Sequence, residues 1–151
     1  MTFRKATLSD IKQMQDIVQD EVSNGTILYR SDDEIATNIR SYTLAIKDKK
    51  IVGYGALHIH TNTLAEIRSL IVDKEFQGQG VGKKLVSNLL KEAVTLKVKK
   101  VFTLTYKEDF FKKLGFEVIP KESLPEQKIW ADCIKCKHFP VCNEVSLIIN
   151  I

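Results

Sequence analysis

Hydrophobic positions near the N-terminus follow a helical period. Apolar side chains three or four residues apart lie on one helix face, and they predict a helix that ends at about Ser23, with Asn24-Gly25 as its C-terminal turn. Thr7 and Asp10 at its start are typical of a capping box. The helix-period positions are Ile11, Met14, Ile17, Val18 and Val22.

The next part of the chain changes to the shorter period of strands. A second capping pair, Ser31 with Glu34, first predicts a short helix to about residue 39. A polar turn at residues 48–50 then predicts a hairpin, and Gly53 and Gly55 within its second strand predict a bulge or a close backbone approach. Strands are predicted at residues 3–6, 43–47, 51–60 and 64–72.

The second half alternates helices with strands. An apolar stripe predicts a long helix over residues 81–96, with Val81, Leu85, Val86, Leu89, Leu90 and Val94 buried. The remaining elements are predicted at 100–106 (strand), 108–114 (helix, ended by Gly115), 116–119 and 144–149 (strands), with an irregular segment at 121–143. The order β-α-α-β-β-β-α-β-α-β-β places antiparallel strands before a parallel crossover, so we predict a mixed α/β sheet covered by helices.

Composition changes this picture little. The 151 residues, 44% hydrophobic and 28% charged, predict a single globular domain over residues 1–151. We expect no membrane span and no signal sequence, hence a cytoplasmic protein. The net charge of +4, with a lysine excess between residues 83 and 100, either steers a polyanionic ligand or marks a solvated helix face. No basic-plus-aromatic array favours nucleic acid.

A glycine-rich stretch lies between the strand at 64–72 and the long helix. Bare backbone at a helix start lets amide N–H groups converge on an anion, so a phosphate or pyrophosphate is the simplest ligand. Gly78 and Gly82 are one residue too close for a Walker A loop, and Lys83 stands where a dinucleotide fingerprint needs its third glycine. The alternative is a strand-to-helix turn without a ligand. The stretch reads Gln77-Gly78-Gln79-Gly80-Val81-Gly82.

The spacing of Gln77, Gly80 and Gly82 resembles the acetyl-coenzyme A motif of the GNAT acetyltransferases, and the element order resembles theirs across nearly the whole chain. Residues 23–31, 55–57, 65–68, 101–105 and 124–126 further resemble the acetyltransferase domain of bacterial N-acetylglutamate synthases, in its short, kinase-free form. The resemblance implies a GNAT-like α/β fold, with a mostly antiparallel central sheet, a parallel splay and helices on both faces. It also implies acetyl transfer from acetyl-CoA to the α-amino group of an amino acid, L-glutamate, in arginine biosynthesis.

The resemblance also assigns the cofactor side of the site. The splay next to the strand at 64–72 exposes backbone groups to the pantetheine arm and thioester. We therefore expect contacts from the amides of Leu70, Ile71 and Val72. The pyrophosphate is expected on the amides of Gln77, Gly78, Gln79, Gly80, Val81, Gly82 and Lys83.

On the acceptor side, Glu66 occupies the strand position of the family's general base, and Arg68 points to the same face. The alternative is a structural pair, with Arg68 or across strands, since a nearby cation weakens a carboxylate as a base. Arg30 and Arg68 are candidates for the acceptor's carboxylates, because a guanidinium matches a carboxylate with two hydrogen bonds. Phe111 stands where many family members have an acidic tyrosine, so Tyr106 is the candidate substitute. His58 and His60 read as structural.

Three cysteines fall in the irregular segment. Cys133, Cys136 and Cys142, with His138 between them, allow a zinc site, but the spacing matches no usual finger. We therefore expect no metal, and an ordered loop instead.

Other functions remain open at this point. They are acetylation of another small amine or a protein N-terminus, coenzyme A binding without turnover, and a zinc-dependent interaction module. The expected partner is a small amino-acid substrate, and the sequence is compatible with a homodimer.

Overall fold

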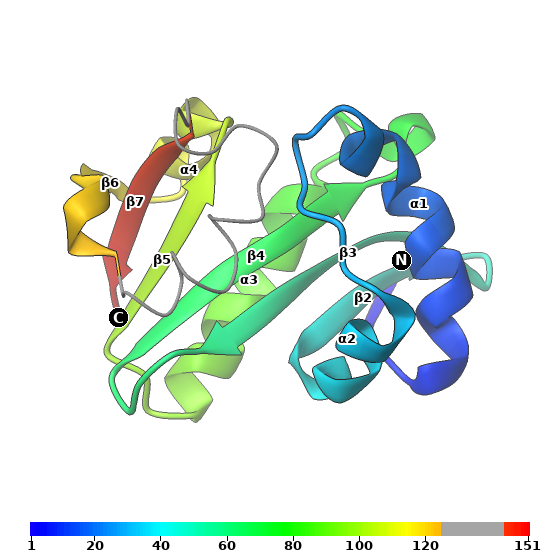
Figure 1. Cartoon of the computed structure of the whole chain (residues 1–151), viewed down its shortest axis with the longest axis horizontal. Helices are drawn as coiled ribbons and strands as arrows, with labels where there is room; N and C mark the ends of the chain where they lie inside the picture. Colours follow the sequence, from blue (N-terminus) through cyan, green and yellow to red (C-terminus); the bar gives the residue numbers. More distant parts are fainter. Residues whose placement is uncertain (125–143) are drawn as a thin grey trace.

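The strands form one mixed sheet. The computed structural model describes residues 1–124 and 144–151, and within them seven strands are ordered β1-β2-β3-β4-β5-β7-β6 (Figure 1). All neighbouring pairs are antiparallel except β4 and β5, which run parallel. The predicted element order and sheet type are confirmed. The strands are β1 (Thr2–Lys5), β2 (Tyr42–Lys47), β3 (Lys50–Ile59), β4 (Leu64–Val72), β5 (Lys100–Thr105), β6 (Glu117–Ile119) and β7 (Val145–Asn150).

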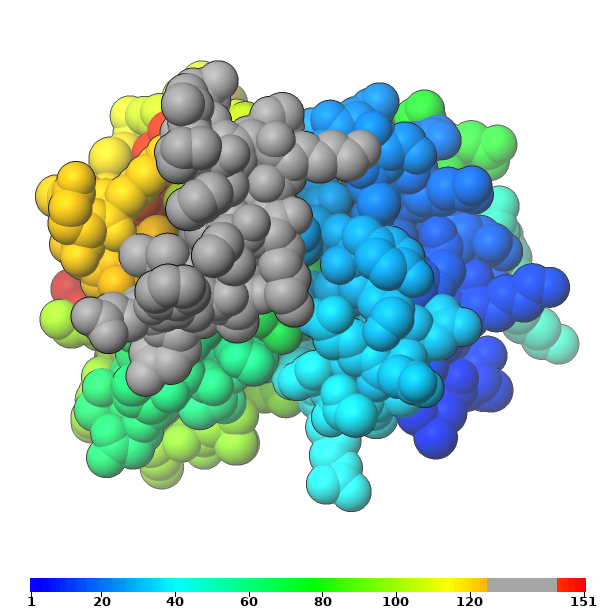
Figure 2. Space-filling view, viewed as in Figure 1, coloured from blue at the N-terminus to red at the C-terminus, as the bar shows by residue number. Residues whose placement is uncertain are grey.

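Helices cover both faces of the sheet, as predicted. On one face, α1 (Ile11–Ser23) and α2 (Asp32–Thr37) share an apolar cluster with β2 and β3. On the other, α3 (Val81–Thr95) packs on β2, β3 and β4, while α4 (Glu108–Lys113) contacts β6 and β7. Figure 1 shows α2 in front of the sheet and α3 behind it. The N-terminal helices and the β6–β7 end lie on opposite sides of the molecule (Figure 2).

The buried stripe of α3 differs from the prediction at one position. Val94 is 56% exposed, whereas Ala93 is fully buried. Leu85, Leu89 and Ala93 follow one another at four-residue spacing, which keeps them on the face toward the sheet. Val94 lies one residue, or about 100°, further round the helix. Its side chain therefore points away from the sheet, although it is larger than that of Ala93.

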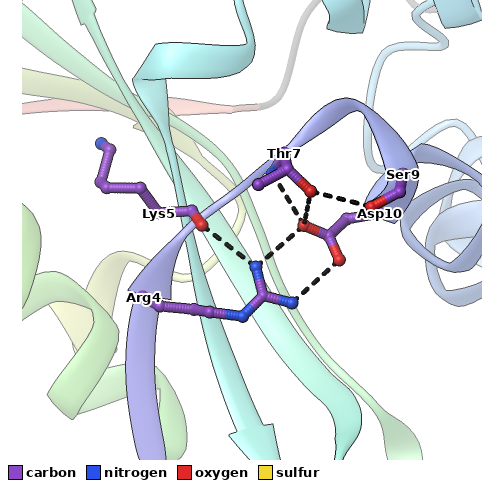
Figure 3. Close-up of polar contacts among 5 residues, drawn as sticks. All are labelled: Arg4, Lys5, Thr7, Ser9 and Asp10. Carbon is purple, nitrogen blue, oxygen red and sulfur yellow. Dashed lines mark hydrogen bonds and ion pairs between the residues drawn. The ribbon is translucent and has the colours of Figure 1, made fainter.

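Both predicted capping pairs form, and in one of them an arginine also binds the capping carboxylate. The Thr7 N–H donates to the Asp10 carboxylate over 2.7 Å, and the Arg4 guanidinium donates two hydrogen bonds of 2.9 Å to the same carboxylate (Figure 3). These hydrogen bonds, chiefly those from Arg4, lower the pKa of Asp10 to about 2. In the second pair, Ser31 Oγ accepts from the Glu34 N–H at the start of α2.

The β3–β4 strand pair is irregular near Gly53 and Gly55, where a bulge or a close backbone approach was predicted. The β3–β4 register shifts between Tyr54 and Ala56, and Ser69 on β4 adopts a φ of +57°. A Cβ at Gly53 would come within 2.8 Å of the Ile71 carbonyl oxygen, and one at Gly55 within 3.0 Å of Leu70. The glycines therefore allow both a bulge and a close approach.

Strands β4 and β5 separate soon after they meet. Their parallel register covers Leu64 to Glu66 on β4 and Lys100 to Phe102 on β5, although β4 continues to Val72. Just past the last pair, the Thr103 hydroxyl donates to the Ile67 carbonyl over 2.9 Å. The strands visibly diverge in Figure 1. The predicted splay is therefore present, and it leaves one edge of β4 open.

The predicted cysteine-containing loop, with its three cysteines and His138, lies outside the described residues. Among the helices in the described ranges, none has the length and apolar character needed to cross a bilayer.

Candidate active site

A cleft of about 610 Å³ opens where β4 and β5 diverge. It runs along β4 from Glu66 to Val72 and on to the glycine loop, and residues 25–30 line it as well. Every site residue predicted from the sequence lines this cleft except Gln79. The Gln79 side chain instead turns back toward the Glu75 carbonyl, 3.4 Å away.

The glycine loop has the geometry of an open backbone cradle. Gly78 and Gly80 have φ angles of +79° and +81°, and a Cβ on either would meet nothing within 4 Å. Gly80 is the N-cap of α3, so the positive end of a 15-residue helix faces the loop. This arrangement fits a pyrophosphate, which needs converging N–H groups and space in front of them.

Two further contacts fix that loop. The Gln77 side chain donates to the Val72 carbonyl over 3.1 Å, which joins the loop to the end of β4. Gly82 packs against Phe110 of α4, whose ring would be 3.3 Å from a Cβ there. Gln77 thus holds the glycine loop against the end of β4, and position 82 must be small because Phe110 of α4 contacts it.

Glu66 is a buried carboxylate on the wall of the cleft. Its side chain is 1% exposed, and Oε1 lies 2.9 Å from Nε2 of His60, whose side chain is 6% exposed. His60 follows the last residue of β3, whereas the residue directly opposite Glu66 in the ladder is His58. Arg68 is two residues along on the same face, opposite Ala56.

The two candidate arginines line the same cleft. Burial raises the pKa of the Tyr42 phenol, while the charges of Arg30 and Arg68 and a hydrogen bond with Ser69 oppose that rise. The Arg30 side chain, 7% exposed, also contacts Glu34 through Nη1 at 2.7 Å. A guanidinium has five N–H donors, so this ion pair and a ligand carboxylate are compatible.

Phe111 and Tyr106, the two positions considered for an acidic tyrosine, differ in exposure. Phe111 is 3% exposed and packs edge-on against Phe110 and Phe116, with ring centroids 5.0 and 5.2 Å away. Tyr106 is 39% exposed and lines the cleft. The described part of the chain thus presents a hydroxyl here from Tyr106, not from position 111.

Sequence reasoning missed four residues around the cleft. Ser69 and Thr103 line the cleft, and His60 contacts Glu66. Tyr42 is close enough to Arg30 and Arg68 for their charges to affect its pKa. Only the histidine had a signal, since His58 and His60 alternate on the strand next to Glu66. No group of three or more metal-ligating side chains is found within residues 1–124 and 144–151.

Comparisons with known proteins agree with this geometry. The sequence model of the acetyltransferase (GNAT) family matches residues 10–116. An uncharacterized N-acetyltransferase of Chlorobaculum tepidum is 37% identical over 96% of this chain and 93% of its own length. An amino-acid acetyltransferase of Mycobacterium tuberculosis is 43% identical over 46% of this chain.

Solved structures share the fold. N-acetylglutamate synthase from Neisseria gonorrhoeae, complexed with coenzyme A and N-acetyl-glutamate, superposes with a TM-score of 0.89 over 99% of this chain at 21% identity. The chain spans only 34% of that synthase and 40% of the Mycobacterium relative.

Proposed function

This chain belongs to the acetyltransferase (GNAT) family and is an acetyl-CoA-dependent N-acetyltransferase, and from that premise we propose that its acceptor is the α-amino group of L-glutamate, in arginine biosynthesis. Relatives named amino-acid acetyltransferase support an amino-acid acceptor.

The observation that carries the proposal is the pair of arginines that line the cleft. Glutamate has two carboxylates, and two guanidiniums in the acceptor site match them. Arg30 and Arg68 both line the cleft. Because each guanidinium can bind a carboxylate through two parallel hydrogen bonds, we propose that the two arginines together bind the acceptor.

Glu66 supplies the general base of this proposal. An amino group at neutral pH carries an extra proton that must leave before the nitrogen can attack the acetyl carbon. The Glu66 carboxylate takes that proton, directly or through water, and the neutral nitrogen then attacks the acetyl carbon. As the nitrogen–carbon bond forms, the nitrogen loses its second proton to water and the carbon–sulfur bond breaks. Arg68 lies two residues away, so the acceptor's carboxylate and amine are held along one strand.

The glycine loop holds the other substrate. The amides from Gln77 to Lys83 bind the pyrophosphate of acetyl-CoA, with Gln79 contributing backbone only. The amides of Leu70, Ile71 and Val72, on the open edge of β4, bind the pantetheine arm and the thioester. Acetyl-CoA supplies the activated acetyl group, and the departing thiolate receives its proton from Tyr106 or from water.

The acceptor is tested by measuring thiol release from acetyl-CoA with a panel of amines. The panel holds glutamate, glutamine, aspartate, a polyamine and a peptide with a free N-terminus. We expect glutamate to exceed glutamine by about tenfold or more in kcat/KM, because glutamine leaves a buried cation without its carboxylate. A chain that is inert toward glutamate but acetylates an uncharged or cationic amine contradicts the acceptor assignment.

One observation favours a second function. The hydroxyl that many family members carry at position 111 is replaced by a buried phenylalanine, which is compatible with coenzyme A binding without turnover. Binding of acetyl-CoA with no thiol release on any amine of the panel would favour this regulator.

A further inference from the structure

We propose that His60 is a positioning residue for the acetyl transfer, and that its imidazole holds the Glu66 carboxylate ready to take a proton from the acceptor amine. This inference rests on the proposed role of Glu66 as general base.

The contact between the two side chains is short and removed from solvent. Nε2 of His60 lies 2.9 Å from Oε1 of Glu66, and the exposed fractions of the side chains are 6% and 1%. A carboxylate in such a place needs hydrogen-bond donors, because burial without them is costly. The His60 imidazole approaches this oxygen within hydrogen-bond distance and can supply one such donor.

The imidazole is itself fixed from three directions. Its ring lies 4.7 Å from the ring of His58 on β3 and 5.3 Å from that of Phe102 on β5. Its backbone N–H donates to the Leu64 carbonyl over 2.9 Å, which closes the turn between β3 and β4. A ring that packing and backbone hold in this way can orient the carboxylate beside it.

The place of the pair in the sheet links it to the cleft. Glu66 and Phe102 are the last residues paired between β4 and β5 before the strands diverge. His60 therefore contacts the proposed base at the closed end of the splay, next to the open edge of β4. A purely structural hydrogen bond could lie anywhere on the sheet, but this one includes a residue that lines the cleft.

The chemistry asks only one thing of His60. An N–H at Nε2 of the imidazole donates to Oε1 and so fixes the orientation of the carboxylate. When the acceptor's ammonium gives its proton to Glu66, the carboxylate becomes a carboxylic acid and the amine becomes neutral. His60 takes no part in this transfer, so it acts through Glu66 and touches no substrate.

The test is a double-mutant cycle with Glu66→Gln. We expect His60→Leu to lower kcat by about tenfold or more while the KM for acetyl-CoA changes less than about twofold. His60→Gln, whose amide N–H can donate to the same oxygen, should recover most of the rate. In the Glu66→Gln background, His60→Leu should change kcat by less than about twofold, because the group it positions is already lost.

The outcomes separate this inference from the proposed function. A His60→Leu enzyme with normal kcat beside an impaired Glu66→Gln enzyme overturns the role of His60 and leaves Glu66 as the base. Equal losses in both backgrounds also overturn it, since His60 would then act independently of Glu66. A fully active Glu66→Gln enzyme refutes the base and, with it, this inference.

If His60→Leu fails to fold, the comparison of His60→Gln with His60→Asn decides, because asparagine is too short to reach Glu66. A retained rate in Gln with a loss in Asn supports the proposal, and equal rates overturn it.

Discussion

At the scale of single residues, the proposed acceptor site is tested most directly at Arg30. It precedes α2, away from the strand that carries Arg68, so its presence in the same cleft depends on the fold. Its side chain is buried. A buried cation of this kind needs anionic partners, of which Glu34 is one.

We predict that Arg30→Ala weakens glutamate use and spares cofactor binding. Losing a charge-assisted pair costs roughly 1.5–3 kcal/mol, about ten- to a hundredfold in kcat/KM for glutamate. Arg30→Lys should recover only part, because an ammonium cannot make the two-bond contact. Steady-state kinetics measure the first effect, and calorimetric titration with acetyl-CoA measures the second.

Arg40→Ala is the matched control, since Arg40 is an exposed arginine that does not line the cleft. It should leave both quantities unchanged. An Arg30→Ala enzyme with the catalytic efficiency of the Arg40→Ala enzyme would remove Arg30 from the acceptor site.

At the scale of elements, the glycine loop and the start of α3 act together. Gly80 is both the helix N-cap and a left-handed residue, and its missing side chain faces open space. A side chain there adds backbone strain as well as bulk in front of the loop amides. Any substitution test must therefore separate charge from strain.

We predict that Gly80→Asp lowers the affinity for acetyl-CoA about ten- to a hundredfold more than Gly80→Asn does. Asparagine and aspartate have similar size, and both tolerate positive φ better than other residues, so the strain is matched. Only aspartate brings a negative charge to the proposed pyrophosphate site. Calorimetric titration measures the two affinities, and equal values would place the pyrophosphate elsewhere.

The elements were more predictable than their contacts. The glycine loop and the element order follow from periodicity and glycine spacing, which are local properties of the chain, whereas the splay was implied only by the resemblance to the acetyltransferase family. The contact between His60 and Glu66 depends on the β3–β4 register and on the turn between them, and sequence spacing could not choose between two alternating histidines. Tyr42 gave no signal, because it comes near Ser69 and the arginines only after three separate segments of the chain have packed.

At the scale of the whole molecule, Asp10 links stability to pH. Its pKa falls from 3.8 to about 2, mainly through the Arg4 hydrogen bonds. A lowered carboxyl pKa contributes stability that is present above the unfolded value and is lost as the pH falls toward the folded one. Arg4 is half-exposed, so solvent screens part of the pair.

We predict that Asp10→Asn lowers the free energy of unfolding by about 1–2 kcal/mol at pH 7. The difference from the parent should shrink as the pH falls from about 4 to about 2. Urea unfolding at several pH values measures it. Asp20→Asn removes an exposed carboxylate paired with Lys74 and should change the free energy of unfolding far less, because solvent screens both partners. A difference for Asp10→Asn that is independent of pH would contradict the linkage.

The short parallel ladder between β4 and β5 has a mechanical consequence. Only the stretch from Leu64 to Glu66 is in register with β5, so the sheet resembles two plates joined at one end. Behind that seam the plates are backed by a continuous apolar cluster, in which Ala65 and Ile67 meet Val101 and Leu147. On the side away from α3 the cleft interrupts them. Among the described residues this backing lies on one side of the seam, so we expect the two plates to move most readily across the cleft.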